Sequence, residues 1–229
     1  QRMIARYPEC AERVKVTHNA ADALFAPAKD RSVAAQQAAA VIGSAAPYYL
    51  VVGKNEPYKA HELALEAFAQ VAREGELLVL IQRTSGGRGL LDVAERLGIA
   101  GRLRFLPTVT GSELASLLQA AQALIQPSLV EGFGIPVLEA MACGCPVVAS
   151  DTAALVEVMG GAGLNARVGS AAALAEQLTR LRSPGLADQL REKGLLRARD
   201  FSWERTAAAT LAVYHEAAAE HARRTRSRT

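Results

Sequence analysis

The sequence of 229 residues predicts an α/β fold built on a doubly wound parallel sheet. Short, continuously apolar runs alternate with longer stretches of helical periodicity. A run that is apolar throughout is typical of a strand buried on both faces, as in a parallel sheet. Helical stretches between such runs provide the right-handed crossovers that place helices on both faces. The expected strands are 14–17, 48–52, 77–81, 103–106, 123–126 and 147–150.

Helices are expected wherever the apolar residues recur every three or four positions. Leu63, Ala67 and Val71 fall on one stripe of such a helix. Gly98 is a suitable C-cap for the helix before it, and Ser202 is a suitable N-cap for the last one. Residues 32–42 are expected to form either a helix or a linker. The other expected helices are 59–73, 90–97, 112–121, 136–142, 170–183, 185–199 and 202–222.

The composition is that of a globular protein, with half of the residues apolar and 21% charged. It excludes a disordered tail or a fibre, and no apolar run approaches the roughly 18 residues of a membrane span. The net charge of +3 is too mild to indicate nucleic-acid binding. The first residues hold no apolar signal segment and no initiator Met, so we expect a fragment or a trimmed chain.

The excess basic charge and the cysteines bear on location. Arg223, Arg224, Arg226 and Arg228 gather at the C-terminus, where they form either a solvated end or a weak contact with anionic lipid or an acidic partner. The three cysteines suggest neither a disulfide framework nor a zinc site. We therefore expect a cytoplasmic protein, with the inner face of the membrane as the alternative.

The loop after strand 48–52 has features of an anion site. Gly53 permits close approach of a ligand to the backbone, and Lys54 and Lys59 follow it. Ligands of open parallel sheets bind at the carboxyl ends of the strands, where this loop lies. Two cations there suit a diphosphate, although loop lysines are more often simply solvated.

The loop after strand 123–126 is the most informative segment. Gly132 and Gly134 flank Phe133 directly before a helix, and such a turn leaves N–H groups at the positive end of the helix dipole. Glu131 precedes the turn, and Glu139 falls about one turn into the helix. Glu139 either accepts hydrogen bonds from a ribose or merely favours the helix dipole.

Glu131 and Glu139 stand eight positions apart with Gly-Phe-Gly between them. This arrangement resembles the E-x7-E signature of the retaining GT-B glycosyltransferases, especially family 4. Gly53-Lys54 followed by Lys59 resembles the donor-phosphate loop of that family, and 104–107 resembles the segment near the nucleotide base. The resemblance covers about residues 14–163 and the start of the last helix.

The resemblance implies a Rossmann-like domain, the C-terminal half of a GT-B enzyme, that transfers a mannosyl- or glucosyl-type hexose from a nucleotide sugar. Lys54 and Lys59 would neutralise the donor diphosphate, and Gly132, Phe133 and Gly134 would offer backbone N–H groups. Lysines and helix N–H groups stabilise charge as it develops on the leaving phosphate. No Asp-x-Asp occurs in the sequence, so neither a metal nor another cofactor is expected.

The remaining site residues are also assigned through the resemblance. Glu131 would contact the hydroxyls of the transferred sugar, which makes it, with Lys54 and Lys59, an expected catalytic residue. Glu139 would hold the ribose, while Leu138 and Val109 would line the nucleotide. The expected partners are a nucleotide sugar and a glycan or lipid-linked acceptor, in cell-surface polysaccharide assembly.

The resemblance also implies a domain organisation and contains departures. Residues 1–46 would be the end of an N-terminal domain with a linker strand and loop, 47–200 the nucleotide-sugar-binding domain, and 201–229 a crossing helix with a basic tail. Gln82 stands where the family keeps glycine, and either it intrudes into the pocket or it contacts the ligand. His61 could touch the donor but is more readily interpreted as a surface residue. The alternative function is a non-catalytic binding module or one half of a split enzyme.

Overall fold

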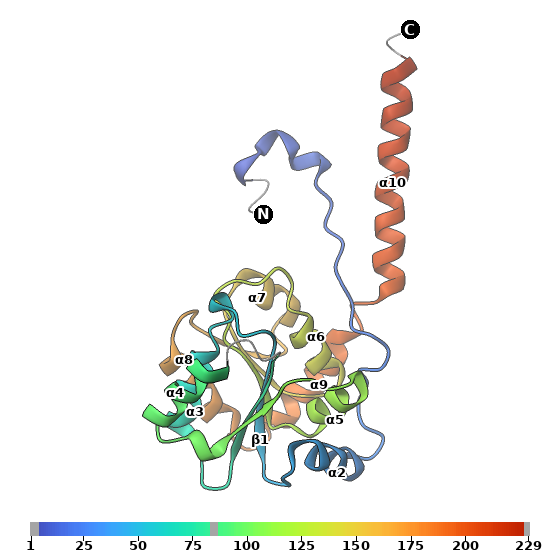
Figure 1. The fold of residues 1–229 in the computed structure, drawn as a ribbon. Helices are drawn as coiled ribbons and strands as arrows, with labels where there is room; N and C mark the ends of the chain where they lie inside the picture. Colours follow the sequence, from blue (N-terminus) through green and yellow to red (C-terminus); the bar gives the residue numbers. More distant parts are fainter. Residues whose placement is uncertain (1–4, 83–86, 227–229) are drawn as a thin grey trace. The chain divides into compact units, whose positions relative to one another are not determined.

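The computed structural model of the chain describes residues 5–82 and 87–226 (Figure 1). The chain divides into two compact units, one spanning Ala21–Asp200 and the other combining the residues up to Ala20 with those from Phe201 onward. Residues 21–46 thus group with the sheet. Of the C-terminal arginines, Arg228 and the side chains of Arg224 and Arg226 lie outside the described part, so their predicted role stays a prediction.

The larger unit contains a single six-stranded sheet in which every pairing is parallel. Its order is β3-β2-β1-β4-β5-β6, which confirms the doubly wound fold class. From β1 the chain builds outward through β2 to β3, then returns and builds outward again from β4. The strands are β1 (Tyr48–Val52), β2 (Leu77–Ile81), β3 (Leu103–Leu106), β4 (Ala123–Gln126), β5 (Val147–Ser150) and β6 (Leu164–Ala166).

Five of the expected strands are confirmed, and two differences stand out. Residues 14–17 form no strand: Val16 is 69% exposed, and in the described part of the chain the segment has no neighbouring strand to pair with. An apolar run becomes a strand only when another strand completes its hydrogen bonds. β6 was not expected, because three residues with an exposed Asn165 in the middle are too short to show a pattern.

Helices cover both faces of the sheet. α3 packs against α4 and α8 on one face, and α5 packs against α2 and α6 on the other, with α7 and α9 next to α6 (Figure 1). The helices of this unit are α2 (Arg31–Ile42), α3 (His61–Val71), α4 (Gly87–Arg96), α5 (Gly111–Ala120), α6 (Ile135–Ala142), α7 (Ala153–Met159), α8 (Ala171–Leu181) and α9 (Leu186–Ala198). Short 3-10 turns span Pro57–Lys59 (η2) and Ala100–Arg102 (η3).

Local capping explains where several helices begin. Residues 31–42 are a helix rather than a linker, because the Ser32 N–H donates to Asp30 Oδ1 at 2.8 Å and Gly43 closes the other end with φ 72°. α5 begins with a capping box, in which the side chains of Thr110 and Glu113 each accept a hydrogen bond from the other's backbone N–H.

A buried ion pair fastens α8 to the strands. Arg182, at the C-cap of α8, donates to Glu76 Oε2 at 2.7 Å, to the Val71 carbonyl at 2.6 Å and to the Tyr49 hydroxyl at 3.2 Å. Tyr49 itself packs edge-on against Phe68 at a centroid distance of 6.1 Å. Glu76 is buried, so without Arg182 its carboxylate would lack its charge partner.

The smaller unit combines a 3-10 turn, η1 (Pro8–Arg13), with α10 (Trp203–Arg226). Within it, the His18 ring meets Phe201 edge-on at 5.7 Å, and the Thr206 hydroxyl donates to the His18 carbonyl. The Arg205 N–H donates to Ser202 Oγ at 3.2 Å, as the expected N-cap requires. Among the described helices, none has the length and apolar character to cross a membrane.

Candidate functional site

The doubly wound topology creates one special edge, between β1 and β4. The crossovers leave these neighbouring strands in opposite directions, so the loops that follow them part and leave a crevice at the carboxyl ends of the strands. The two loops are in contact, because the Leu129 N–H donates to the Tyr58 carbonyl at 2.7 Å. The two loops that the sequence singled out are therefore brought together at the switch point of the sheet.

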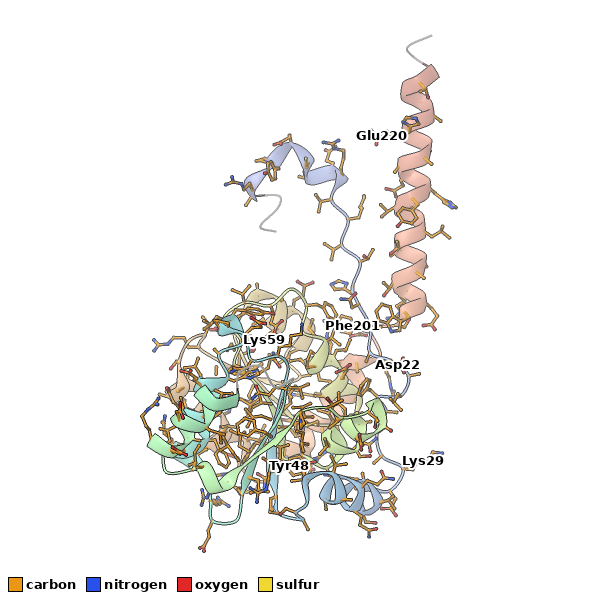
Figure 2. The ribbon with its side chains drawn as sticks, in the orientation of Figure 1. Asp22, Lys29, Tyr48, Lys59, Phe201 and Glu220 are labelled. Carbon is orange, nitrogen blue, oxygen red and sulfur yellow. The ribbon has the colours of Figure 1, made fainter. Side chains whose placement is uncertain are left out.

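Glu131 is the centre of the polar contacts at this point. Its Oε1 lies 2.6 Å from Lys59 Nζ, 2.8 Å from Gln126 Nε2 and 2.8 Å from Ser128 Oγ (Lys59 is labelled in Figure 2). The Glu131 and Lys59 side chains are only 8% and 14% exposed. All three donors converge on one oxygen, and within the described residues Oε2 has no hydrogen-bond partner.

Gln126 and Ser128 belong to this cluster although the sequence analysis did not name them. Gln126 is almost completely buried, and its Nε2 donates to both Ser128 and Glu131. The opposite amide orientation would place oxygen against the carboxylate, so the orientation is fixed, and Oε1 is left as a buried acceptor with no partner in the described part of the chain. A polar residue at the end of the otherwise apolar run 123–126 was the available signal.

Gly53 and Lys54 border a second part of the crevice. Gly53 has φ 141°, a conformation that L residues rarely adopt, and a Cβ at this position would lie in ordinary van der Waals contact with His61 and Lys59, 3.9 Å from an atom of each. A cavity of about 270 Å³ begins there and is lined by Lys54, Gln82 and Val109 at the ends of β1, β2 and β3. Val109 therefore borders this cavity, and its contact with the nucleotide stays a prediction.

The start of α6 depends on Gly134. It adopts φ 103° as the N-cap residue, and a Cβ there would stand 2.6 Å from Leu155 Cδ2. Gly132 is different, because nothing lies within 4 Å of its would-be Cβ. Phe133 is half-buried between them. The turn therefore brings the N-terminus of α6 to the edge where the Glu131 cluster lies, as the sequence predicted for an anion site.

Glu139 and Leu138 follow within α6 and differ in accessibility. Burial, followed by the nearby charge of Asp22, raises the pKa of the Glu139 carboxyl to about 7. Glu139 keeps part of its surface exposed, and its carboxylate, unlike its backbone carbonyl, has no hydrogen-bond partner among the described residues; its contact with a ribose stays a prediction. Leu138 is completely buried, so the expected nucleotide contact is corrected: its side chain supports the helix from the core.

His61 and Gln82 form a buried pair beneath Gly53. His61 is 2% exposed, so its interpretation as a surface residue was wrong. Its Nδ1 lies 3.3 Å from Gln82 Oε1, so Gln82 both borders the cavity and packs under the β1 loop. Burial lowers the pKa of His61, the charge of Lys59 lowers it further, and the bond to Gln82 opposes both.

The described part of the chain holds no group of three or more His, Cys, Asp or Glu side chains that could bind a metal ion. Metal-independent binding of a diphosphate stays a prediction. Cys143 and Cys145 are free and buried, and burial raises the pKa of each thiol to about 12, so both thiols stay protonated at neutral pH.

The sheet order and the crevice between β1 and β4 define a Rossmann-like α/β domain of the GT-B glycosyltransferase type. Residues 33–196 match the family described as Glycosyl transferases group 1. This match covers more than half of the chain, and the chain belongs to that family.

Three similar proteins illustrate the relationship. A D-inositol 3-phosphate glycosyltransferase of Salinispora arenicola is 35% identical over 96% of this chain and 53% of its own length. O-antigen chain mannosyltransferase B of Escherichia coli is 36% identical over 73% of this chain and 45% of its own. The structure of Anabaena Alr3699/HepE in complex with UDP-glucose superimposes with a TM-score of 0.77 at 20% identity, over 91% of this chain and 58% of that one. The chain thus spans about half the length of the curated relatives it matches.

Proposed function

We propose that this chain is the donor-binding half of a retaining glycosyltransferase, which transfers a hexose from a nucleotide sugar to a glycan or glycolipid acceptor. The observation that carries the proposal is the cluster of polar side chains around Glu131 at the switch point of the sheet. A cation, Lys59, and a carboxylate, Glu131, meet beside a glycine whose backbone is open to a ligand. A diphosphate needs the cation, and sugar hydroxyls need the carboxylate, at adjacent positions.

The proposed chemistry follows from these groups. In glycosyl transfer the bond between the anomeric carbon and the diphosphate oxygen breaks, and its electron pair goes to the leaving phosphate. A hydroxyl oxygen of the acceptor forms the new bond to the anomeric carbon, and its proton passes to the leaving phosphate. The developing charge is stabilised without a metal, by Lys59, Lys54 and the N–H groups at the start of α6. Such electrostatic stabilisation is normally the largest catalytic contribution. Glu131 Oε2 accepts hydrogen bonds from hydroxyls of the sugar and so orients it, while Glu139 accepts hydrogen bonds from the ribose.

The similar proteins support the choice of substrate class. One relative is named as a mannosyltransferase, and one protein of the same fold was solved with UDP-glucose. We therefore propose that the transferred sugar is a hexose of the mannosyl or glucosyl type, used in cell-surface polysaccharide assembly. A cytoplasmic location, or one at the inner face of the membrane, is part of the same proposal.

A second candidate function rests on the coverage of the relatives. Because the chain spans about half of them, it can also be a nucleotide-sugar-binding module without catalysis of its own, or one half of a split enzyme. In the enzyme proposal the acceptor wall is supplied by a second domain. Sugar transfer by the purified chain alone would exclude a non-catalytic binding module. It would also show that no second domain is needed for activity.

Titration calorimetry of the purified chain with UDP-glucose, GDP-mannose and ADP-glucose tests donor binding. One of the three is expected to bind, and Glu139→Ala is expected to weaken that binding about ten- to a hundredfold, since a charged hydrogen bond contributes roughly 1.5–3 kcal/mol. Glu95→Ala, an exposed carboxylate on α4, is the matched control and should bind like the wild type. Failure of all three donors to bind would contradict the proposal.

A further inference from the structure

His61 separates two cavities at the carboxyl edge of the sheet. On one side its ring lines a cavity of about 430 Å³, together with Asn55, Pro57 and Leu129. On the other side it contacts Gln82, which borders the cavity of about 270 Å³ at the ends of β1, β2 and β3. An almost completely buried histidine between two cavities is positioned to meet a ligand rather than bulk water.

The contact with Gln82 determines which ring nitrogen carries the proton. An amide oxygen can only accept a hydrogen bond, so His61 Nδ1 is the donor across the 3.3 Å to Gln82 Oε1. In the neutral ring this leaves Nε2 with a lone pair and no hydrogen. Burial and the charge of Lys59 favour this neutral form. Within the described residues Nε2 has no hydrogen-bond partner.

Nε2 and Lys59 border the same open space. A Cβ built on Gly53 would lie 3.9 Å from His61 Nε2 and 3.9 Å from Lys59 Cε, and apart from the two chain neighbours of Gly53 no other described residue comes within 4 Å of it. Glycine leaves that space empty, and it adjoins the lysine that is proposed to bind a diphosphate. An anionic oxygen above the Cα of Gly53 would therefore meet the ammonium group and the imidazole together.

We infer that His61 is a further contact of the donor diphosphate and that its imidazole takes up one proton when the diphosphate binds above Gly53. The inference rests on the proposed function. Nε2 takes the proton from solvent and then donates it in a hydrogen bond to a phosphate oxygen, while Nδ1–H keeps its bond to Gln82. The imidazole is neutral without donor and cationic with it, so the donor and a proton bind together.

The surrounding charges are consistent with this exchange. Lys59 opposes protonation of the ring, whereas the two negative charges of a diphosphate favour it more strongly. Three glutamates line the cavity on the far side of the ring, and Glu131 shares Lys59. The charged side chains around His61 are Lys54, Glu56, Lys59, Glu62, Glu66 and Glu131.

Proton uptake can be measured directly. Binding of UDP-glucose and of GDP-mannose is measured by titration calorimetry at pH 7.5 in two buffers, Pipes and Tris. Because the ionisation enthalpies of these buffers differ, the difference between the two binding heats gives the number of protons taken up. The diphosphate of a nucleotide sugar does not titrate near neutral pH, so it exchanges no protons itself. On donor binding, the wild type is expected to take up as much as one proton more than the His61→Gln variant. The glutamine amide of that variant can hydrogen-bond to the diphosphate but cannot take up a proton. Because Glu139 also titrates near pH 7, the readout is the ratio of the wild-type affinity to that of His61→Gln, which should fall by up to about tenfold for each pH unit between 6.5 and 8.

Two further readouts separate the outcomes. NMR of the imidazole resonances should show the His61 ring of the wild type change from neutral to cationic on donor binding, which does not depend on the stability of a variant. His215→Gln, an exposed histidine on α10, should leave the proton count unchanged. Donor binding with no proton uptake and an unchanged ring would overturn this inference alone. Failure of these two donors and of ADP-glucose to bind would overturn the proposed function as well.

Discussion

Lys59 Nζ lies 2.6 Å from Glu131 Oε1, although the two residues are 72 positions apart in the chain. This ion pair joins the loop after β1 to the loop after β4 and so links the two halves of the doubly wound sheet. Glu131 Oε1 also receives hydrogen bonds from Gln126 and Ser128. Lys59 can therefore turn toward a diphosphate without leaving the carboxylate unpartnered.

Replacing Lys59 by methionine should lower the free energy of unfolding by about 1–3 kcal/mol, because a largely buried carboxylate loses its counter-ion but keeps two donors. Urea denaturation at pH 7.5 measures the change. The double variant Lys59→Met/Glu131→Gln should recover part of the loss, since it removes the uncompensated charge. Lys54→Met, on the exposed lysine of the same loop, is the control and should stay within about 0.5 kcal/mol of wild type. Equal losses for both lysines would refute a structural role of the pair.

Gly134→Ala should destabilise the protein by about 1–3 kcal/mol and weaken donor binding, because the residue adopts φ 103° and its new Cβ would overlap Leu155. Gly132→Ala places the same methyl group two residues away in open space and should cost much less. Thermal denaturation of the two variants side by side makes the comparison. A Gly132 variant as damaged as the Gly134 variant would show that the turn matters for another reason.

Glu139→Gln should stabilise the protein at pH 8 and leave its stability unchanged at pH 4. The pKa of this carboxyl rises from 4.5 in the unfolded chain to about 7 in the folded one, so the folded state binds more protons between these values. The stabilising contribution is complete below pH 4.5 and is lost as the pH rises through 7. With allowance for partial exposure, we expect a gain of about 1 kcal/mol at pH 8. Urea titrations at both pH values test this, and a gain at pH 4 of the same size would contradict it.

Gln82→Leu should lower the pKa of His61 further below its ordinary value of 6.5. The Gln82 oxygen accepts from the ring and favours its charged form, and leucine of similar size removes that bond while keeping the ring buried. NMR titration of the imidazole resonances measures the shift. An upward shift would indicate that the substitution admits water to the ring.

The apolar runs predicted most of the fold because parallel strands are buried on both faces and show little else. β1, β2 and β4 are almost completely buried, and these runs were recognised without ambiguity. Residues 14–17 have the same local character, but sequence cannot show whether a neighbouring strand is present to complete the hydrogen bonds. The fate of such a run depends on tertiary contacts rather than on its own residues.

Only those residues of the candidate site that belong to sequence motifs could be predicted. Glu131, Lys59 and Gly53 were found because loops after parallel strands converge on one edge. Gln126, Ser128 and the burial of His61 were not found, since hydrogen bonding between side chains of different loops leaves no periodic trace. Leu138 shows the opposite limit, because the residue next to the partly exposed Glu139 on the helix points in another direction and joins the core.

The contacts of Arg182 also bear on how the chain folds as it is synthesised. Its partners Val71, Glu76 and Tyr49 precede it by 111, 106 and 133 residues. The β1-α3-β2 segment therefore leaves the ribosome before Arg182, so the Glu76 carboxylate does not yet have its charge partner. The face that α8 will cover stays exposed to water until α8 and Arg182 have also emerged. Completion of that face is a late event, and nascent chains that end before Arg182 are expected to depend on chaperones for longer than chains that extend past it.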